Sequence, residues 1–81
     1  MFKVYILYSS QIDQYYVGHT QDIEDRLMRH NSGSSLSTKK GKPWILMYTE
    51  SIETRSEAMI REKAIKKMKS RAYIEQLILT K

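Results

Sequence analysis

The chain has 81 residues, a formal charge of +5 at pH 7 and 41% hydrophobic residues, which suits one domain over residues 1 to 81 that buries about 60 to 65% of its unfolded surface. The absence of cysteine excludes disulfides, thiolate metal sites and thiol nucleophiles, and two histidines are too few for an all-histidine zinc site. No apolar run is long enough for a membrane span or a signal peptide, so we expect a cytoplasmic protein with no membrane partner.

The N-terminal residues predict a β-hairpin. Residues 2–8 (FKVYILY) and 15–19 (YYVGH) are rich in β-branched and aromatic residues, and a largely polar stretch separates them. Because side chains alternate along a strand, Tyr5 and Leu7 share one face, and the Tyr5 hydroxyl could reach the rim of the sheet. Gly18 would let another backbone or a phosphate approach the second strand closely.

The middle of the chain predicts a short helix, a loop and a third strand. Asp22 is a suitable N-cap for the helix, and Gly33 is typical of a helix end. Residues 32–43 are rich in serine, glycine and lysine and are expected to form one long loop. Residues 44–49 (WILMYT) follow the only proline and indicate the third strand.

Arg26 and His30 are unusual because they lie on the apolar stripe of this helix, with Ile23 and Leu27. Polar side chains on a face that packs against a sheet need a buried partner or a ligand. The alternative is a structural role, in which Arg26 extends its charged end to water and His30 is favoured near the helix C-terminus.

The last third of the chain predicts two helices. The first begins at Thr54 or Ser56, and Ser70 separates it from a second helix over residues 71–79. The element order is therefore β-β-α-β-α-α. This order favours an α+β fold, with helices packed on a small antiparallel or mixed sheet.

Glu62 lies at the border of the apolar face that Ala58, Ile65 and Met68 mark on the first of these helices. Its carboxylate could bind a divalent ion whose other ligands are water and phosphate, an arrangement that magnesium accepts. The alternative is an ordinary surface ion pair with Lys66, one helical turn later.

The positive charge is concentrated near the C-terminus, where residues 53–81 contain eight basic and four acidic side chains. Five of these basic side chains could follow a phosphate backbone: Lys63, Lys66, Lys67, Lys69 and Arg71. The alternative is a solvated helix face without a partner.

Five ordered elements of the sequence resemble the GIY-YIG endonuclease superfamily, in particular its small stand-alone members and the nuclease domain of the excinuclease C subunit. They are Lys3-Val4-Tyr5, Tyr16-Val17-Gly18, Arg26, His30, and Glu62 within the stretch Ser-Glu-Ala-x-x-x-Glu-Lys-x-x-Lys. The resemblance covers nearly the whole chain. It implies a three-stranded antiparallel sheet flanked by helices, with the two tyrosines on adjacent strands.

The resemblance also implies a site and an activity. Tyr5 and Tyr16 match the tyrosines of the two family motifs, and Arg26 matches the catalytic arginine. His30 matches a position that histidine or tyrosine occupies, and Glu62 matches the metal-binding glutamate. Such nucleases use Mg²⁺ or Mn²⁺ to hydrolyse a phosphodiester bond of DNA, with an arginine on the phosphate and a tyrosine or histidine acting on water. Which side chain is the base stays open.

The chain departs from the family pattern at three places. Lys3-Val4 replaces Gly-Ile in the first motif, and Ile74 stands near the position of an asparagine found in larger family nucleases. His19 follows the second motif where some members have a lysine, and it could contact a phosphate, transfer a proton or do neither. His19 therefore joins Lys63, Lys66 and Lys69 as a nucleic-acid-binding candidate.

Three hypotheses follow. The first is a metal-dependent DNA endonuclease, structure-selective in DNA repair or processing, without a small-molecule cofactor. The second is a nucleic-acid-binding module with weak or lost catalysis, and the third is an interaction subunit that uses its tyrosines and Met59 as a contact surface. Because about 80 residues leave little surface for reading base edges, we expect a second copy of the chain or a partner protein to supply specificity.

Overall fold

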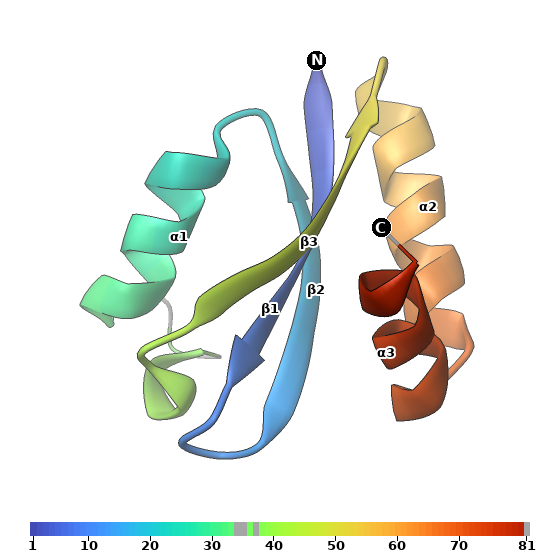
Figure 1. Ribbon diagram of the computed structural model, residues 1–81. Helices are drawn as coiled ribbons and strands as arrows, with labels where there is room; N and C mark the ends of the chain where they lie inside the picture. Colours follow the sequence, from blue (N-terminus) through green and yellow to red (C-terminus); the bar gives the residue numbers. More distant parts are fainter. Residues whose placement is uncertain (34–35, 37, 81) are drawn as a thin grey trace.

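The computed structural model describes residues 1–33, 36 and 38–80, and within them the elements follow the expected order (Figure 1). The strands are β1 (Phe2–Ser9), β2 (Gln14–Thr20) and β3 (Ile45–Ile52). The helices are α1 (Ile23–Ser32), α2 (Arg55–Lys67) and α3 (Arg71–Leu79), with the 3-10 helix η1 (Lys39–Gly41) between α1 and β3. The expected loop over residues 32–43 thus contains a helical turn, and its residues 34, 35 and 37 lie outside the described residues.

The sheet is antiparallel and has the strand order β2-β1-β3, so β1 is the central strand. In its register, Tyr5 lies between Gly18 of β2 and Thr49 of β3. The α+β fold expected from the sequence is confirmed, and the sheet is antiparallel, as the resemblance implied.

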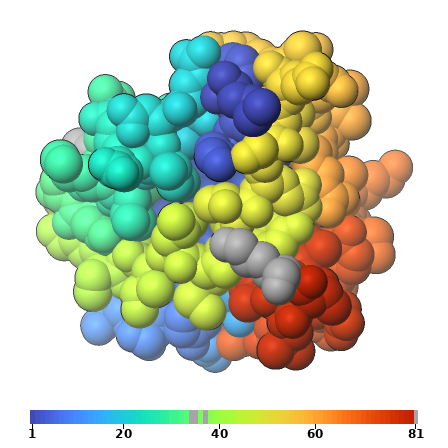
Figure 2. Space-filling view, turned by 45° about the horizontal axis from the view of Figure 1, so that its top comes forward, coloured from blue at the N-terminus to red at the C-terminus, as the bar shows by residue number. Residues whose placement is uncertain are grey.

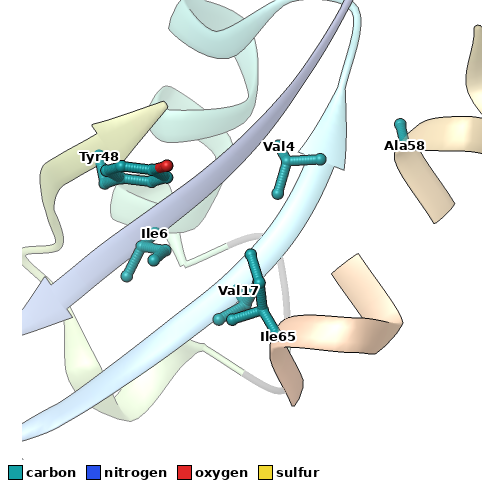
Figure 3. Packing of buried hydrophobic residues seen from close by; sticks show 6 residues of the cluster. All are labelled: Val4, Ile6, Val17, Tyr48, Ala58 and Ile65. Atoms are coloured by element: carbon teal, nitrogen blue, oxygen red, sulfur yellow. The ribbon is translucent and has the colours of Figure 1, made fainter. Parts of the chain in front are cut away.

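Both faces of β1 are buried, because α1 packs on one side of the sheet while α2 and α3 pack on the other (Figure 1). On the side of α2, the main core contains Val4, Ile6, Val17, Tyr48, Ala58 and Ile65 (Figure 3). On the side of α1, Tyr5, Leu7 and Trp44 pack against Ile23 and Leu27. The first helix therefore packs through the apolar stripe that its sequence predicted.

The helix ends follow from their capping residues. The Asp22 side chain accepts the Asp25 N–H at 3.0 Å at the start of α1, and Gly33 ends this helix with φ at 81°. Thr54, rather than Ser56, caps α2. The expectation that Met68 belongs to the apolar face of α2 is wrong, because the helix ends at Lys67 and Met68 is 53% exposed.

Arg71 attaches the start of α3 to the turn between β1 and β2. Its guanidinium donates to Asp13 Oδ1 at 2.7 Å and to Glu75 Oε2 at 3.2 Å, and it lies 5.2 Å from the centroid of the Tyr15 ring. The hairpin and the C-terminal helix therefore form one packed unit. None of the helices in the described ranges has the length and apolar character needed to cross a membrane.

Candidate active site

Tyr5 belongs to a chain of buried hydrogen bonds beneath α1. Its hydroxyl lies 3.1 Å from His30 Nε2, and His30 Nδ1 lies 2.8 Å from Thr38 Oγ1. The Thr38 carbonyl accepts the indole N–H of Trp44 at 2.7 Å. All four residues are buried. The Tyr5 hydroxyl is therefore not at the rim of the sheet, because it is buried beneath α1 and bonded to His30.

Tyr5 and His30 are both neutral at neutral pH. Burial and the neighbouring Tyr16 raise the pKa of Tyr5 to about 12, against the opposing effect of the Arg26 guanidinium. Burial, followed by the charge of Arg26, lowers the pKa of His30. With its proton on Nδ1, His30 donates a hydrogen bond to Thr38 Oγ1 and accepts one at Nε2 from the Tyr5 hydroxyl. These bonds fix the orientation of both rings.

Gly18 allows the Tyr5 ring to lie against β2. A Cβ atom at position 18 would lie 2.6 Å from the Tyr5 hydroxyl oxygen and 2.7 Å from Tyr5 Cζ. No side chain larger than hydrogen fits there without displacing the ring. The close approach that the sequence suggested at Gly18 is thus made by an aromatic ring of the central strand, not by another backbone or a phosphate.

Tyr16 lies on the same face of the sheet and is only half-buried. Its ring centroid is 4.9 Å from that of His30, in an edge contact, and 6.3 Å from that of Tyr5. Trp44 contacts the same ring, with the centroids 6.1 Å apart. Among the described residues, none hydrogen-bonds to the Tyr16 hydroxyl. This phenol is therefore held by its ring and has its oxygen available.

Glu62 projects from α2 toward β2, where its two carboxylate oxygens have different partners. Oε1 accepts a hydrogen bond from His19 Nδ1 at 2.6 Å, and Oε2 accepts one from Lys66 Nζ at 2.7 Å. The Glu62 side chain is 17% exposed. Burial opposes its ionisation, but the hydrogen bonds from Lys66 and His19 outweigh this effect and lower the pKa of the carboxyl group. Glu62 is thus a carboxylate at neutral pH.

The tyrosine group (Tyr5, Tyr16 and His30) and the Glu62 group (Glu62, His19 and Lys66) lie on opposite faces of the sheet. They approach each other around β2, an edge strand of the described sheet. Tyr16 and Gly18 face α1, whereas Val17 and His19 face α2, as the alternation along a strand requires. Lys66 connects the two groups, because its ammonium lies 5.9 Å from the centroid of the Tyr16 ring while it binds Glu62. The site thus combines side chains from β1, β2, α1 and α2.

A pocket of about 290 Å³ adjoins both groups at the end of β2. It is lined by Phe2, His19, Thr20, Gln21, Asp22, Arg26 and Arg55. Figure 2 shows the start of the chain in blue between α1 and the yellow segment that leads from β3 into α2. His19 belongs both to this pocket and to the Glu62 pair, and Arg26 belongs both to the pocket and to the surroundings of Tyr5.

The structure brings together most of the residues that the sequence singled out. Tyr5, Tyr16, Arg26 and His30 surround the α1 side of the site, and His19, Glu62 and Lys66 form its α2 side. Lys63 is exposed on α2. Lys69 does not flank Glu62, because α2 ends at Lys67 and Lys69 lies instead beside the β1–β2 turn and the start of α3.

Sequence reasoning missed three residues of the site: Thr38, Trp44 and Arg55. Thr38 and Trp44 lie in and just after the long loop, so the hydrogen bond from Thr38 to His30 depends on tertiary packing that no local pattern reveals. The tryptophan at the start of the predicted strand over residues 44–49 was the signal that could have indicated an ordered loop end, and in the structure it lies just before β3. Arg55 lies in the first turn of α2, where its one available signal was a charge close to a helix cap.

Glu62 is the residue best suited to hold a divalent cation. No group of three or more His, Asp or Glu side chains with metal-ligand geometry is present in the described part of the chain. The donor set fits an ion that binds through one carboxylate and completes its shell with water and phosphate oxygens. A carboxylate has about four lone-pair sites, and His19 and Lys66 use two of them.

Comparison with known proteins gives a consistent result. Residues 1–74 match the model of the GIY-YIG catalytic domain. A UPF0213 protein of Halobacterium salinarum is 41% identical over 78 residues, which cover 95% of this chain and 99% of that protein. A UPF0213 protein of Enterococcus faecalis is 41% identical over 73 residues, covering 86% and 82%. The solution NMR structure of a UPF0213 protein from Bacillus halodurans has a TM-score of 0.62 at 34% identity, covering 100% of this chain and 86% of that one.

Proposed function

The chain belongs to the GIY-YIG catalytic domain family, a superfamily of nucleases, and from this membership we propose that it is a metal-dependent endonuclease that hydrolyses phosphodiester bonds in DNA. One observation supports the proposal above all others. The phenol of Tyr16, the guanidinium of Arg26 and the carboxylate of Glu62 come from three different elements and surround the same edge of β2. A phenol, a cation and a metal-binding oxygen are the groups that phosphodiester hydrolysis needs.

The reaction requires charge stabilisation on the phosphate, an oriented water and a proton for the leaving oxygen. As water attacks phosphorus, one phosphorus–oxygen bond forms and the opposite one breaks, while the attacking water loses a proton to solvent and the leaving oxygen takes one up from solvent. Arg26 is assigned to the phosphate, because a guanidinium can donate two parallel hydrogen bonds to phosphoryl oxygens. Its position in the lining of the pocket and near Tyr5 supports this assignment.

We assign different roles to the two tyrosines. No described residue hydrogen-bonds to the Tyr16 hydroxyl and its ring is half-exposed, so it is the phenol that can reach the attacking water, accept a hydrogen bond from it and orient it for attack. Tyr5 is buried, its pKa is raised to about 12, and its hydroxyl is engaged with His30. Tyr5 and His30 therefore act through Tyr16, as positioning residues that hold its ring in place.

Glu62 is assigned to a Mg²⁺ or Mn²⁺ ion, which when bound supplies positive charge to the scissile phosphate and its leaving oxygen. The chain's own contribution is to keep this carboxylate ionised and oriented. His19 and Lys66 do both, since their hydrogen bonds lower the pKa of Glu62 and fix its two oxygens. His19, Lys63 and Lys66 are also assigned to the phosphate backbone around the site, and Lys69 to its periphery.

The wider role is proposed on the same basis. We assign the activity to structure-selective DNA processing or repair in the cytoplasm, because a site of this size contacts few base edges. A second copy of the chain or a partner protein would then select the position of the cut.

A nucleic-acid-binding module without efficient catalysis is the second candidate. Two observations favour it. Both carboxylate oxygens of Glu62 already have cationic or imidazole partners. Ile74, near the place of the asparagine in larger family nucleases, packs against the main core and presents no polar group.

Cleavage assays on nicked, branched and single-stranded DNA with Mg²⁺ or Mn²⁺ distinguish the two candidates. We expect the wild-type protein to cut at least one substrate and Glu62→Gln to lose this activity. Glu53→Gln is the matched control, because it removes an exposed carboxylate of the same chemistry outside the site. Cleavage that survives in Glu62→Gln would refute the assigned mechanism. Salt-sensitive binding with no cleavage on any substrate would favour the binding module.

A further inference from the structure

The arginines of this chain fall into two groups. Arg29, Arg61 and Arg71 each form an ion pair with a carboxylate. Arg26 and Arg55 have no carboxylate partner among the described residues, which include all five arginines. The two unpaired arginines come from different helices, yet they line the same pocket.

Arg55 is held in the pocket without using its hydrogen-bond donors. Its guanidinium carbon lies 5.1 Å from the centroid of the Phe2 ring. A cation–π contact of this kind does not engage the guanidinium N–H groups with a polar acceptor. Arg55 is thus a cation held against an aromatic ring, and none of its guanidinium N–H groups donates to a described residue.

The remaining lining of the pocket suits an anion with oxygen acceptors. Asp22 is its one carboxylate, and this side chain already accepts the Asp25 N–H as the N-cap of α1. Gln21 adds an exposed amide. Two guanidiniums against one engaged carboxylate leave the pocket positive. Its volume of about 290 Å³ is at the lower limit of pockets that hold small molecules, and it leaves room for a phosphate.

We propose that Arg55 binds a backbone phosphate of the DNA strand a few nucleotides from the phosphate that is cut. This inference rests on the proposed function for its substrate. Arg55 and Glu62 are seven residues apart on α2, so they lie on nearly the same side of the helix and about 10 Å apart along its axis. At a rise of about 3.4 Å per nucleotide, a strand along this side places the Arg55 phosphate within about three nucleotides of the scissile bond. Arg55 would then set the register of the strand.

The test uses the wild-type protein and a metal-free oligothymidylate of about eight nucleotides. In NMR titrations the Nε–Hε resonances of Arg26 and Arg55 should shift together with one dissociation constant. Arg55→Gln should weaken binding about tenfold and lower the slope of log K against log salt by about 0.7, the value for one phosphate contact on a single strand. Arg55→Lys should keep that slope. Lys40→Gln removes an exposed cation of η1 outside the pocket and should change both quantities much less.

Three results would overturn the inference: an Arg55 resonance that does not shift, an unchanged salt slope in Arg55→Gln, or an equal loss in Lys40→Gln. The resonance shifts are measured on the unaltered protein, so they decide the matter even where a variant folds poorly. Oligonucleotide binding through Arg55 without metal-dependent cleavage would overturn the proposed function but support this phosphate site. Cleavage with an unchanged KM and salt slope in Arg55→Gln would overturn the phosphate site alone.

Discussion

Replacing Gly18 by alanine tests whether the site depends on the packing of Tyr5 against β2. The new Cβ atom would lie 2.6 Å from Tyr5 Oη, 2.7 Å from Tyr5 Cζ and 3.2 Å from Tyr16 Cε1. The Tyr5 ring has little freedom to move, because it is buried and its hydroxyl is bound to His30. The backbone at position 18 is not left-handed, so the cost of the substitution comes from the clash and not from backbone strain.

The expected magnitude follows from two contributions. Forcing an additional carbon into a packed interior costs about 1 to 3 kcal/mol. Displacing the Tyr5 hydroxyl from His30 adds about 1 kcal/mol for the lost buried hydrogen bond. Together they predict that Gly18→Ala lowers the free energy of unfolding by about 2 to 4 kcal/mol. This is a large fraction of the total, since a domain of this size is stable by about 4 to 12 kcal/mol.

Urea unfolding followed by circular dichroism measures this loss. Tyr5→Phe serves as the partner variant, because it removes the hydroxyl that the new Cβ would meet first while it keeps the ring. In the double variant we expect the loss to be about 1 kcal/mol smaller than the sum of the two single losses. A Gly18→Ala protein within about 0.5 kcal/mol of wild type, or strictly additive effects, would refute the packing argument.

Three further predictions concern metal binding, pH and the C-terminal helix. Lys66→Gln leaves Glu62 Oε2 without its cation and should tighten Mn²⁺ binding several-fold, measured by paramagnetic broadening; an affinity equal to that of wild type would contradict competition between Lys66 and the metal. The lowered pKa of His30 means that the unfolded chain binds more protons below about pH 6.5, so stability is complete above that pH and falls as the pH drops. His30→Gln should therefore show a weaker decrease of the thermal midpoint between about pH 7 and pH 5, and an unchanged decrease would argue against this linkage. Arg71→Gln breaks the contacts to Asp13 and Glu75 and should lower the urea midpoint, by an amount that shrinks at high salt; a loss independent of salt would assign the effect to packing on the hairpin instead.

The fold was predictable because its signals are local. Runs of β-branched and aromatic residues indicated the strands, and Asp22, Gly33 and Ser70 lie where helix caps are needed. The stripe containing Arg26 and His30 was visible from helical periodicity alone. Met68 was misplaced because periodicity does not say where a helix ends, and here the chain turns away just before that residue.

The candidate site was only partly predictable, because its contacts depend on distant parts of the chain. Strand register brings Gly18 against Tyr5, and no spacing in the sequence specifies which ring fills the space left by a glycine. The role of Thr38 depends on its tertiary contact with His30, which no local sequence pattern specifies. Lys66 appeared in the sequence as a surface partner of Glu62, whereas its position over Tyr16 follows from the packing of α2 along the edge of β2.

The place of each strand in the sheet gives the two motif tyrosines different mechanical properties. Tyr5 lies on the central strand, whose neighbours on both sides must separate before it can move, so its amide should be among the slowest to exchange with deuterium. Tyr16 lies on an edge strand of the described sheet, paired on one side only. Local opening of β2 can therefore shift Tyr16 toward a bound DNA strand while the hydrogen bond between the Tyr5 hydroxyl and His30 remains in place. One part of the site is thus held by the central strand, whereas the other lies on an edge strand that can open locally at a free energy below that of global unfolding.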